Sequence, residues 1–131
     1  MQIIPGVDWS PSRDAAVIVD QRRLPGELVY RELRTVGETC DAVRTLAVRG
    51  APAIGVAGAM GLVASLLPHV RETEPAFASH LMAYGLAIRT TRPTAVNLSW
   101  AIDRLLAAAS NAEGGNVGRL EAMREEATAI C

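Results

Sequence analysis

Lysine is absent from this chain of 131 residues, and all 13 of its basic residues are arginines. A chain without lysine has no amine for a Schiff base and no lysine for a phosphate-binding loop, so both chemistries are excluded. An anion that binds here must therefore be held by arginine side chains or by backbone N–H groups.

An excess of charge of one sign is also missing. The 13 basic residues are intermixed with 14 acidic ones, for a net charge of −1. This balance provides no basic surface for a nucleic acid backbone, so we expect no nucleic acid partner. Charged residues within the first thirty positions leave no continuous apolar core for a secretory signal, and we expect a cytoplasmic protein.

Cysteine is scarce, with only Cys40 and Cys131 present. Neither has a second cysteine or a histidine at the spacing of a metal site, so we expect no metal there and a reducing compartment. Cys40 falls on the apolar side of its expected helix and is interpreted as a small core residue, not a nucleophile.

Residues 50–68 form a run of nineteen positions with no formal charge. The run is long enough to cross a bilayer. It is built largely from alanine and glycine, however, and has prolines near both ends, which favours a fully buried helix in a soluble domain. A small membrane-associated protein built on this run remains the least favoured interpretation, and we expect no membrane partner.

Short strands are predicted before residue 34. Residues 15–20 and 28–33 are rich in β-forming side chains and are separated by a Leu-Pro-Gly break, which indicates a small antiparallel sheet. Thr35 and Glu38 have the spacing of a capping box, so the first helix should begin there and end at Arg49-Gly50.

Four more helices are expected after the first. The patterns and breaks place them over 52–67, 75–88 and 95–109, and, after a polar loop at 110–116, along an apolar stripe of Leu120, Met123, Ala127 and Ile130. The predicted fold class is α+β, a small antiparallel β-sheet followed by a bundle of about five helices. We expect one domain, 1–131, with a sheet segment 1–34 and a helical segment 35–131.

Two further expectations come from the end of the last helix and from the glycines of the second. The last apolar stripe continues to the final residue without a stop signal, so we expect the chain to continue or to meet a partner surface. Gly55, Gly58 and Gly61 recur every third residue in the second helix. Each costs about 0.5–1 kcal/mol relative to alanine, which indicates close approach by another backbone.

Two arginines stand just before helices, in the segments RGAPA and RPTA. A helix N-terminus offers unpartnered N–H groups and a partial positive charge, and a guanidinium adds a fork that matches phosphate. Arg49 and Arg92 are therefore candidate anion-binding residues. On spacing alone, the alternative that both cap the carbonyl ends of the preceding helices is the stronger one.

Other polar residues are weaker candidates. His69 and His80 are interpreted as helix-end or surface residues, because neither has a serine, cysteine or aspartate at a telling spacing. Asn97 is one turn from the start of its helix and could contact a ligand, although a capping or solvent-facing role is favoured. Asp103 is not assigned a role as an acid.

Three segments resemble the signature sequences of methylthioribose-1-phosphate isomerases. They are VDQRRLP at 19–25, VRGAPAIGVAGAMG at 48–61 and TRPTAVNLSWAIDR at 91–104. They occur in the family's order, and relatives in the initiation factor 2B and ribose-1,5-bisphosphate isomerase superfamily share parts of them. The resemblance covers about residues 9–124.

The resemblance implies a function and a set of site residues. The family interconverts an aldose 1-phosphate and a ketose 1-phosphate in methionine salvage, with no metal or organic cofactor. Its substrate contacts carry over to Arg49, Gly50, Ala51 and Arg92. Its catalytic cysteine and aspartate belong to a second, Rossmann-like domain, so no catalytic residue is assigned here, and Cys131, which follows EEATAI, does not take that role.

The resemblance also implies partners. They are a sugar-phosphate substrate, a missing C-terminal domain or partner subunit that supplies the Rossmann-like half, and further copies in a homo-oligomer. Without the groups that move the proton, the chain alone should be inactive. The competing hypothesis is a non-catalytic regulatory or assembly module of the initiation factor 2B type.

Overall fold

The computed structural model describes residues 7–12, 14–23, 25–45 and 51–130. Three strands, β1 (Val7–Trp9), β2 (Ala16–Val19) and β3 (Tyr30–Leu33), form an antiparallel sheet in the order β1-β2-β3. Val7 pairs with Ile18, and Ala16 pairs with Leu33. These four side chains are buried and share one face of the sheet, because side chains alternate along a strand.

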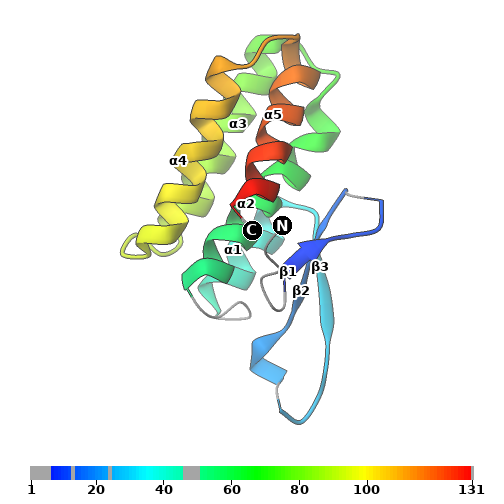
Figure 1. Cartoon of the computed structure of the whole chain (residues 1–131), viewed down its shortest axis with the longest axis vertical. Helices are drawn as coiled ribbons and strands as arrows, with labels where there is room; N and C mark the ends of the chain where they lie inside the picture. Colours follow the sequence, from blue (N-terminus) through cyan, green and yellow to red (C-terminus); the bar gives the residue numbers. More distant parts are fainter. Residues whose placement is uncertain (1–6, 13, 24, 46–50, 131) are drawn as a thin grey trace.

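Five α-helices follow the sheet, which confirms the α+β class. They are α1 (Val36–Arg44), α2 (Ala51–Leu66), α3 (Glu74–Thr90), α4 (Val96–Asn111) and α5 (Gly115–Ala129), with 3-10 turns η1 (Gln21–Arg23) and η2 (Leu67–His69). The sheet lies at one end of the helical bundle, and the hairpin between β2 and β3 extends away from it (Figure 1). The strands described by the structure all precede α1.

The start of α1 is set by its local sequence. Thr35 Oγ1 accepts a hydrogen bond from the Glu38 N–H at 3.1 Å, and Glu38 Oε1 accepts from the Thr35 N–H at 3.1 Å. This is the capping box that the sequence predicts.

Helix α2 is the centre of the fold. It contacts the other four helices and strands β1 and β2, and every residue of 53–66 is buried. The segment Pro52–His69 is apolar and long enough to cross a membrane, with a mean hydropathy of 1.4, but 78% of it is buried inside the protein. A helix that is covered on all sides has no face exposed to solvent, which explains why residues 50–68 include no charged side chain.

The three glycines of α2 allow its neighbours to approach, but the predicted close backbone is present only at Gly55. A Cβ built on Gly55 would lie 3.0 Å from the Asn97 carbonyl oxygen, whereas one on Gly58 would lie 2.5 Å from Leu98 Cδ1. A Cβ on Gly61 would overlap the side chain of Thr39. A larger residue would therefore have to displace the α4 backbone at Gly55 and Thr39 at Gly61, but only the end of a leucine side chain at Gly58.

The structure corrects several predicted bounds. Strand β1 was not predicted. Its three residues are too few to show the alternation of side chains that marks a strand. Helix α1 ends at Arg44, before the expected stop at 49–50, and Thr45 closes it by donating both its N–H and its hydroxyl to the Asp41 carbonyl. The predicted end of the second helix before Pro68 is confirmed, because α2 ends at Leu66 and Pro68 then lies in the first turn of η2.

Candidate functional site at the starts of helices α2 and α4

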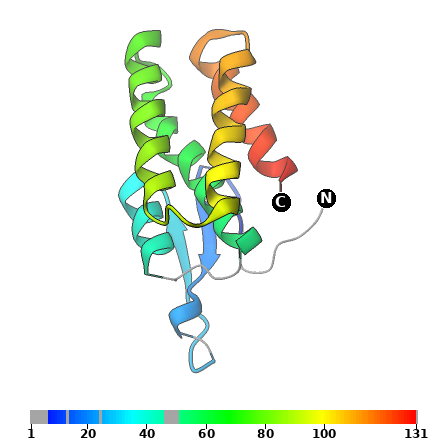
Figure 2. The ribbon, with the colours of Figure 1, turned by 90° about the vertical axis from the view of Figure 1, so that its left-hand side faces the viewer.

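Helices α2 and α4 begin side by side. Gly55, in the second turn of α2, packs against the backbone of Asn97 and the Cβ of Ala101 in α4. Because Asn97 is the second residue of α4, the N-terminal ends of both helices lie at the same end of the bundle (Figure 2). Two partial positive charges and two sets of early N–H groups are thus brought together.

Helix α4 starts without a side-chain cap. The first turns of α1 and α3 are capped by Thr35 and Thr73, whose hydroxyls accept backbone N–H bonds. Ala95 occupies the same position in α4, in an extended conformation, and its methyl group accepts nothing. The early N–H groups of α4 are therefore left for water or for a ligand such as phosphate.

Arg92 lies in the turn that leads into α4. Its carbonyl accepts the Ala95 N–H at 2.9 Å, which closes the turn, and the residue is half-buried. Its guanidinium forms no ion pair or hydrogen bond with any residue that the structure describes, whereas nearby Arg89 pairs with Asp103 at 3.2 Å. The positive charge of Arg92 is thus available beside the uncapped helix start.

The structure bears on the capping alternative for Arg92. Threonine hydroxyls bond to carbonyls near the end of α3: Thr90 Oγ1 donates to Leu86 O at 2.8 Å, and Thr91 Oγ1 donates to Ile88 O at 2.6 Å. No bond from Arg92 to a carbonyl of α3 is present in the described part of the chain. The described contacts therefore give the capping alternative no support.

A small pocket opens between the two helix starts and the end of α5. It has a volume of about 130 Å³ and is lined by Pro52, Gly55, Val56, Asn97, Trp100, Ala101 and Ile130. Pockets for small organic ligands measure roughly 300–1,000 Å³. This one accommodates only part of a sugar phosphate, and the rest must contact residues outside it. Asn97, exposed at the second position of α4, supplies its polar side chain.

The predicted site residues are only partly visible. Arg49 and Gly50 lie outside the described residues, and the backbone of Ala51 begins α2. That Arg49 and Arg92 face one cleft remains a prediction. Among the weaker candidates, Asp103 is exposed and pairs with Arg89.

Cys40 is a buried residue of α1, as the sequence predicts. Burial raises the pKa of its thiol, and the nearby Arg44 only partly opposes this effect. A protonated, enclosed thiol is a poor nucleophile, which agrees with a packing role.

One ion-pair group was missed by sequence reasoning. The buried Asp20 carboxylate accepts hydrogen bonds from Arg22 Nε at 2.9 Å and from an Arg22 terminal nitrogen at 2.7 Å, and Arg31 lies 3.6 Å away. These bonds lower the pKa of Asp20 to about 2. Arg22 also donates to Thr45 Oγ1 at 3.2 Å and so ties the sheet to the end of α1. The segment 19–25 entered the sequence argument only through the family resemblance.

Comparison with known proteins gives a consistent assignment. Residues 47–130 match the family model described as Initiation factor 2 subunit family. The methylthioribose-1-phosphate isomerase of Gemmatimonas aurantiaca is 48% identical over 127 residues, which cover 97% of this chain and 36% of that protein. The 5-deoxyribose 1-phosphate isomerase of Bacillus cereus is 39% identical, over 84% of this chain and 31% of that protein.

Solved structures share the fold. The translation initiation factor eIF-2B subunit delta from A. fulgidus superposes with a TM-score of 0.87 and 33% identity, over 98% of this chain and 36% of that one. The 5-methylthioribose 1-phosphate isomerase from Pyrococcus horikoshii gives a TM-score of 0.87 and 29% identity, over 97% and 36%. The chain spans about a third of the length of these relatives. The predicted resemblance is confirmed: this chain belongs to the initiation factor 2 subunit family, with relatives named methylthioribose-1-phosphate isomerase.

Proposed function

We propose that this chain is the N-terminal, substrate-binding part of a methylthioribose-1-phosphate isomerase. The enzyme would convert 5-methylthioribose 1-phosphate into 5-methylthioribulose 1-phosphate in the cytoplasm, as a step of methionine salvage. Relatives with this name are 48% and 50% identical over 97% and 73% of the chain. The chain would form one domain, with a sheet segment over 1–34 and a helical segment over 35–131.

The observation that carries the proposal is the pair of adjacent helix starts. The substrate phosphate would accept hydrogen bonds from the N–H groups of α2 and of the uncapped α4, and ion pairs from Arg49 and Arg92. Gly50 and Ala51 would let the phosphate approach the main chain closely. The chain's role is to hold the anion, and the groups that move the proton would belong to a C-terminal domain or partner subunit, in a homo-oligomer.

The names of the relatives support the proposal that this part of the protein binds the phosphate end. Methylthioribose 1-phosphate and 5-deoxyribose 1-phosphate share the ribose 1-phosphate portion and differ at the other end of the sugar. Relatives of both names match this chain at 38–50% identity. A site for the common phosphate would be retained in both, so discrimination between the two sugars would belong elsewhere.

A second candidate is a non-catalytic regulatory or assembly module. The solved initiation factor subunit is 33% identical to the chain, against 29% for the solved isomerase, at the same TM-score. Such a module would keep the fold and the oligomeric contacts without the reaction.

An activity assay separates the two candidates. The chain joined to its C-terminal domain or partner subunit, incubated with 5-methylthioribose 1-phosphate and followed by ¹³C NMR, should form the ketose product. Arg92→Ala should weaken substrate binding by about 1.5–3 kcal/mol, or about 10- to 150-fold, because it removes charged hydrogen bonds. Arg71→Ala, an exposed arginine at the other end of α2, is the control. Absence of product with intact phosphate binding would favour the module, and unchanged binding in Arg92→Ala would contradict the site.

A further inference from the structure

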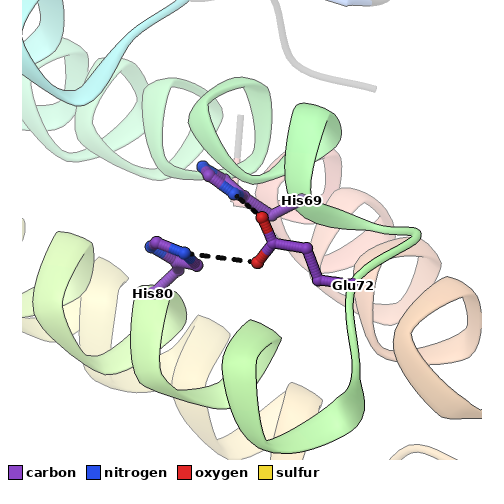
Figure 3. Close-up of side chains that lie close together, drawn as sticks. All are labelled: His69, Glu72 and His80. Carbon is purple, nitrogen blue, oxygen red and sulfur yellow. Dashed lines mark hydrogen bonds and ion pairs between the residues drawn. The ribbon is translucent and has the colours of Figure 1, made fainter.

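The only two histidines of the chain meet at the far end of α2. His69 closes η2, Glu72 lies in the connection to α3, and His80 is in the second turn of α3. The Glu72 carboxylate lies beside the two rings and contacts both, with Oε2 at 2.7 Å from His69 Nδ1 and Oε1 at 3.2 Å from His80 Nε2 (Figure 3). Helix α2 has 16 residues and is about 24 Å long, so this cluster is remote from the phosphate site.

We propose that His69, Glu72 and His80 form a binding site for one divalent transition-metal ion of the zinc class. Two imidazole nitrogens and one carboxylate oxygen are a ligand set that Zn²⁺ accepts, with a fourth position left for water. The donor atoms of the three residues all lie within 4.8 Å of one another. The site is independent of the proposed isomerase function.

The geometry requires only a small movement to close on an ion. Ligands bound at about 2.0–2.2 Å in a tetrahedron are roughly 3.4 Å apart, so donor atoms up to 4.8 Å apart must approach by up to about 1.4 Å. Glu72 Oε2 and His69 Nδ1, which lie 2.7 Å apart, must instead separate slightly to admit the ion. The side chains of Glu72 and His80 are each 37% exposed and can rotate by that much. His69, at 21% exposure, is the more fixed ligand.

Neighbouring residues hold the ligands in place. The hydroxyl of Tyr84, one turn after His80 on α3, lies 3.0 Å from His69 Nε2. By accepting the Nε2 proton it would leave Nδ1 free to bind the metal, which is the usual role of a group that orients a histidine ligand. The buried Asn116 of α5 donates its Nδ2 to the carbonyls of Val70 at 3.2 Å and Glu72 at 2.7 Å, which fixes the backbone between two of the ligands.

The arrangement of the rings brings both imidazoles to one place. They stack with centroids 3.9 Å apart and planes 22° apart, and their nitrogens lie within reach of one ion.

Zinc titration by calorimetry tests the site. The protein should carry Cys131→Ser, so that the thiol does not compete for zinc. We expect one Zn²⁺ per chain, and at least a 100-fold loss of affinity in the double variant His69→Ala, His80→Ala. Glu72→Gln should weaken binding by about 10- to 100-fold. Glu121→Gln, which removes an exposed carboxylate on α5 that pairs with Arg124, should leave it unchanged.

Histidine ¹⁵N NMR tests the site with both histidines in place, so this measurement does not require the histidine variants to fold. Zinc should shift the Nδ1 resonance of His69 and the Nε2 resonance of His80, and Tyr84→Phe should lower zinc affinity by about 10-fold or more through the orientation of His69. Zinc that leaves these nitrogens unchanged, or that still binds the double histidine variant with undiminished affinity, would overturn the proposal. Neither result would bear on the phosphate site.

Discussion

At the scale of single residues, substitution by alanine should have opposite effects on the free energy of unfolding at two buried glycines. Gly61 of α2 faces Thr39, a stiff β-branched residue that is fully buried and bonded to Thr35 O at 3.1 Å. An added Cβ must displace it. Gly61→Ala should therefore lower the free energy of unfolding by about 1–2 kcal/mol, despite the better helix propensity of alanine.

Gly85 of α3 is the matched control. A Cβ there would lie 3.5 Å from Leu106 Cδ2, which is an ordinary packing distance. Gly85→Ala should raise the free energy of unfolding by up to about 1 kcal/mol. Urea denaturation of both variants measures the difference, and two changes of the same sign would contradict this description of helix packing.

The Asp20 cluster makes the stability depend on pH. Its carboxylate has a pKa of about 2 in the fold against an ordinary 3.8, so the folded state favours the ionised form. The stabilisation is present above about pH 4 and is lost as the pH falls toward 2. Asp20→Asn should lower the free energy of unfolding at pH 7 by about 2–4 kcal/mol and flatten this acid dependence.

Denaturation at several pH values between 2 and 7 measures the effect. Glu27→Gln serves as the control, because Glu27 is 67% exposed and only 3.9 Å from Arg23 in its ion pair. If the free energy of unfolding of Asp20→Asn fell with pH as it does in the unaltered protein, other carboxylates would be the cause of the acid dependence.

The contacts of a residue could be predicted from the sequence where its partners are close to it along the chain. The capping box of Thr35 and Glu38 spans four positions, and the glycines of α2 show their spacing directly. His69 and Tyr84 are 15 positions apart, and Arg22 and Thr45 are 23 apart. Such contacts depend on how elements pack, which no local pattern encodes. The histidines were correctly placed near a helix end and at the surface, but their contact was missed for this reason.

At the scale of elements, the missing cap of α4 connects stability with binding. Ala95 has the extended conformation of an N-cap residue but no side-chain acceptor. Ala95→Asp should raise the free energy of unfolding by about 1 kcal/mol, since its carboxylate would accept early N–H groups and interact with the helix dipole. The same carboxylate should weaken phosphate binding at least 10-fold, because it would occupy the N–H groups that bind the phosphate and would repel the phosphate charge.

Thr73→Ala is the control for the cap of α4. It removes the acceptor of the Ala76 N–H at the start of α3, so it should destabilise the protein by about 1 kcal/mol without changing phosphate binding. Thermal unfolding and phosphate titration of both variants provide the comparison. A more stable Ala95→Asp protein with unchanged phosphate affinity would place the anion elsewhere.

Element boundaries were predictable only where a cap or a breaker marks them. The turn at 90–94 and the start of α1 were identified in this way. The end of α1 at Arg44 was not, because no glycine or proline marks it and the Thr45 bonds that close it depend on the folded backbone. The end of α2 before Pro68 was also identified, and Pro68 then fits the first turn of η2.

At the scale of the whole molecule, the absence of charge in residues 50–68 follows from the position of α2. A helix enclosed by four helices and a sheet loses stability with any charged side chain, so its composition resembles that of a membrane span. The sequence predicted the burial of this helix and the fold class. That α2 and α4 begin at the same end was implied by the prediction that Arg49 and Arg92 share one cleft, but no pattern in the sequence determines it, because it depends on the packing of the bundle.

The central claim is that the starts of α2 and α4 together bind a phosphate. Backbone amide NMR during titration with ribose 1-phosphate tests it most directly. The largest shifts should fall on the amides of residues 51, 53, 54 and 96–98, and Arg92→Ala should reduce them at both helices. Shifts confined to one helix or to other surfaces, or shifts that persist unchanged in Arg92→Ala, would contradict the claim.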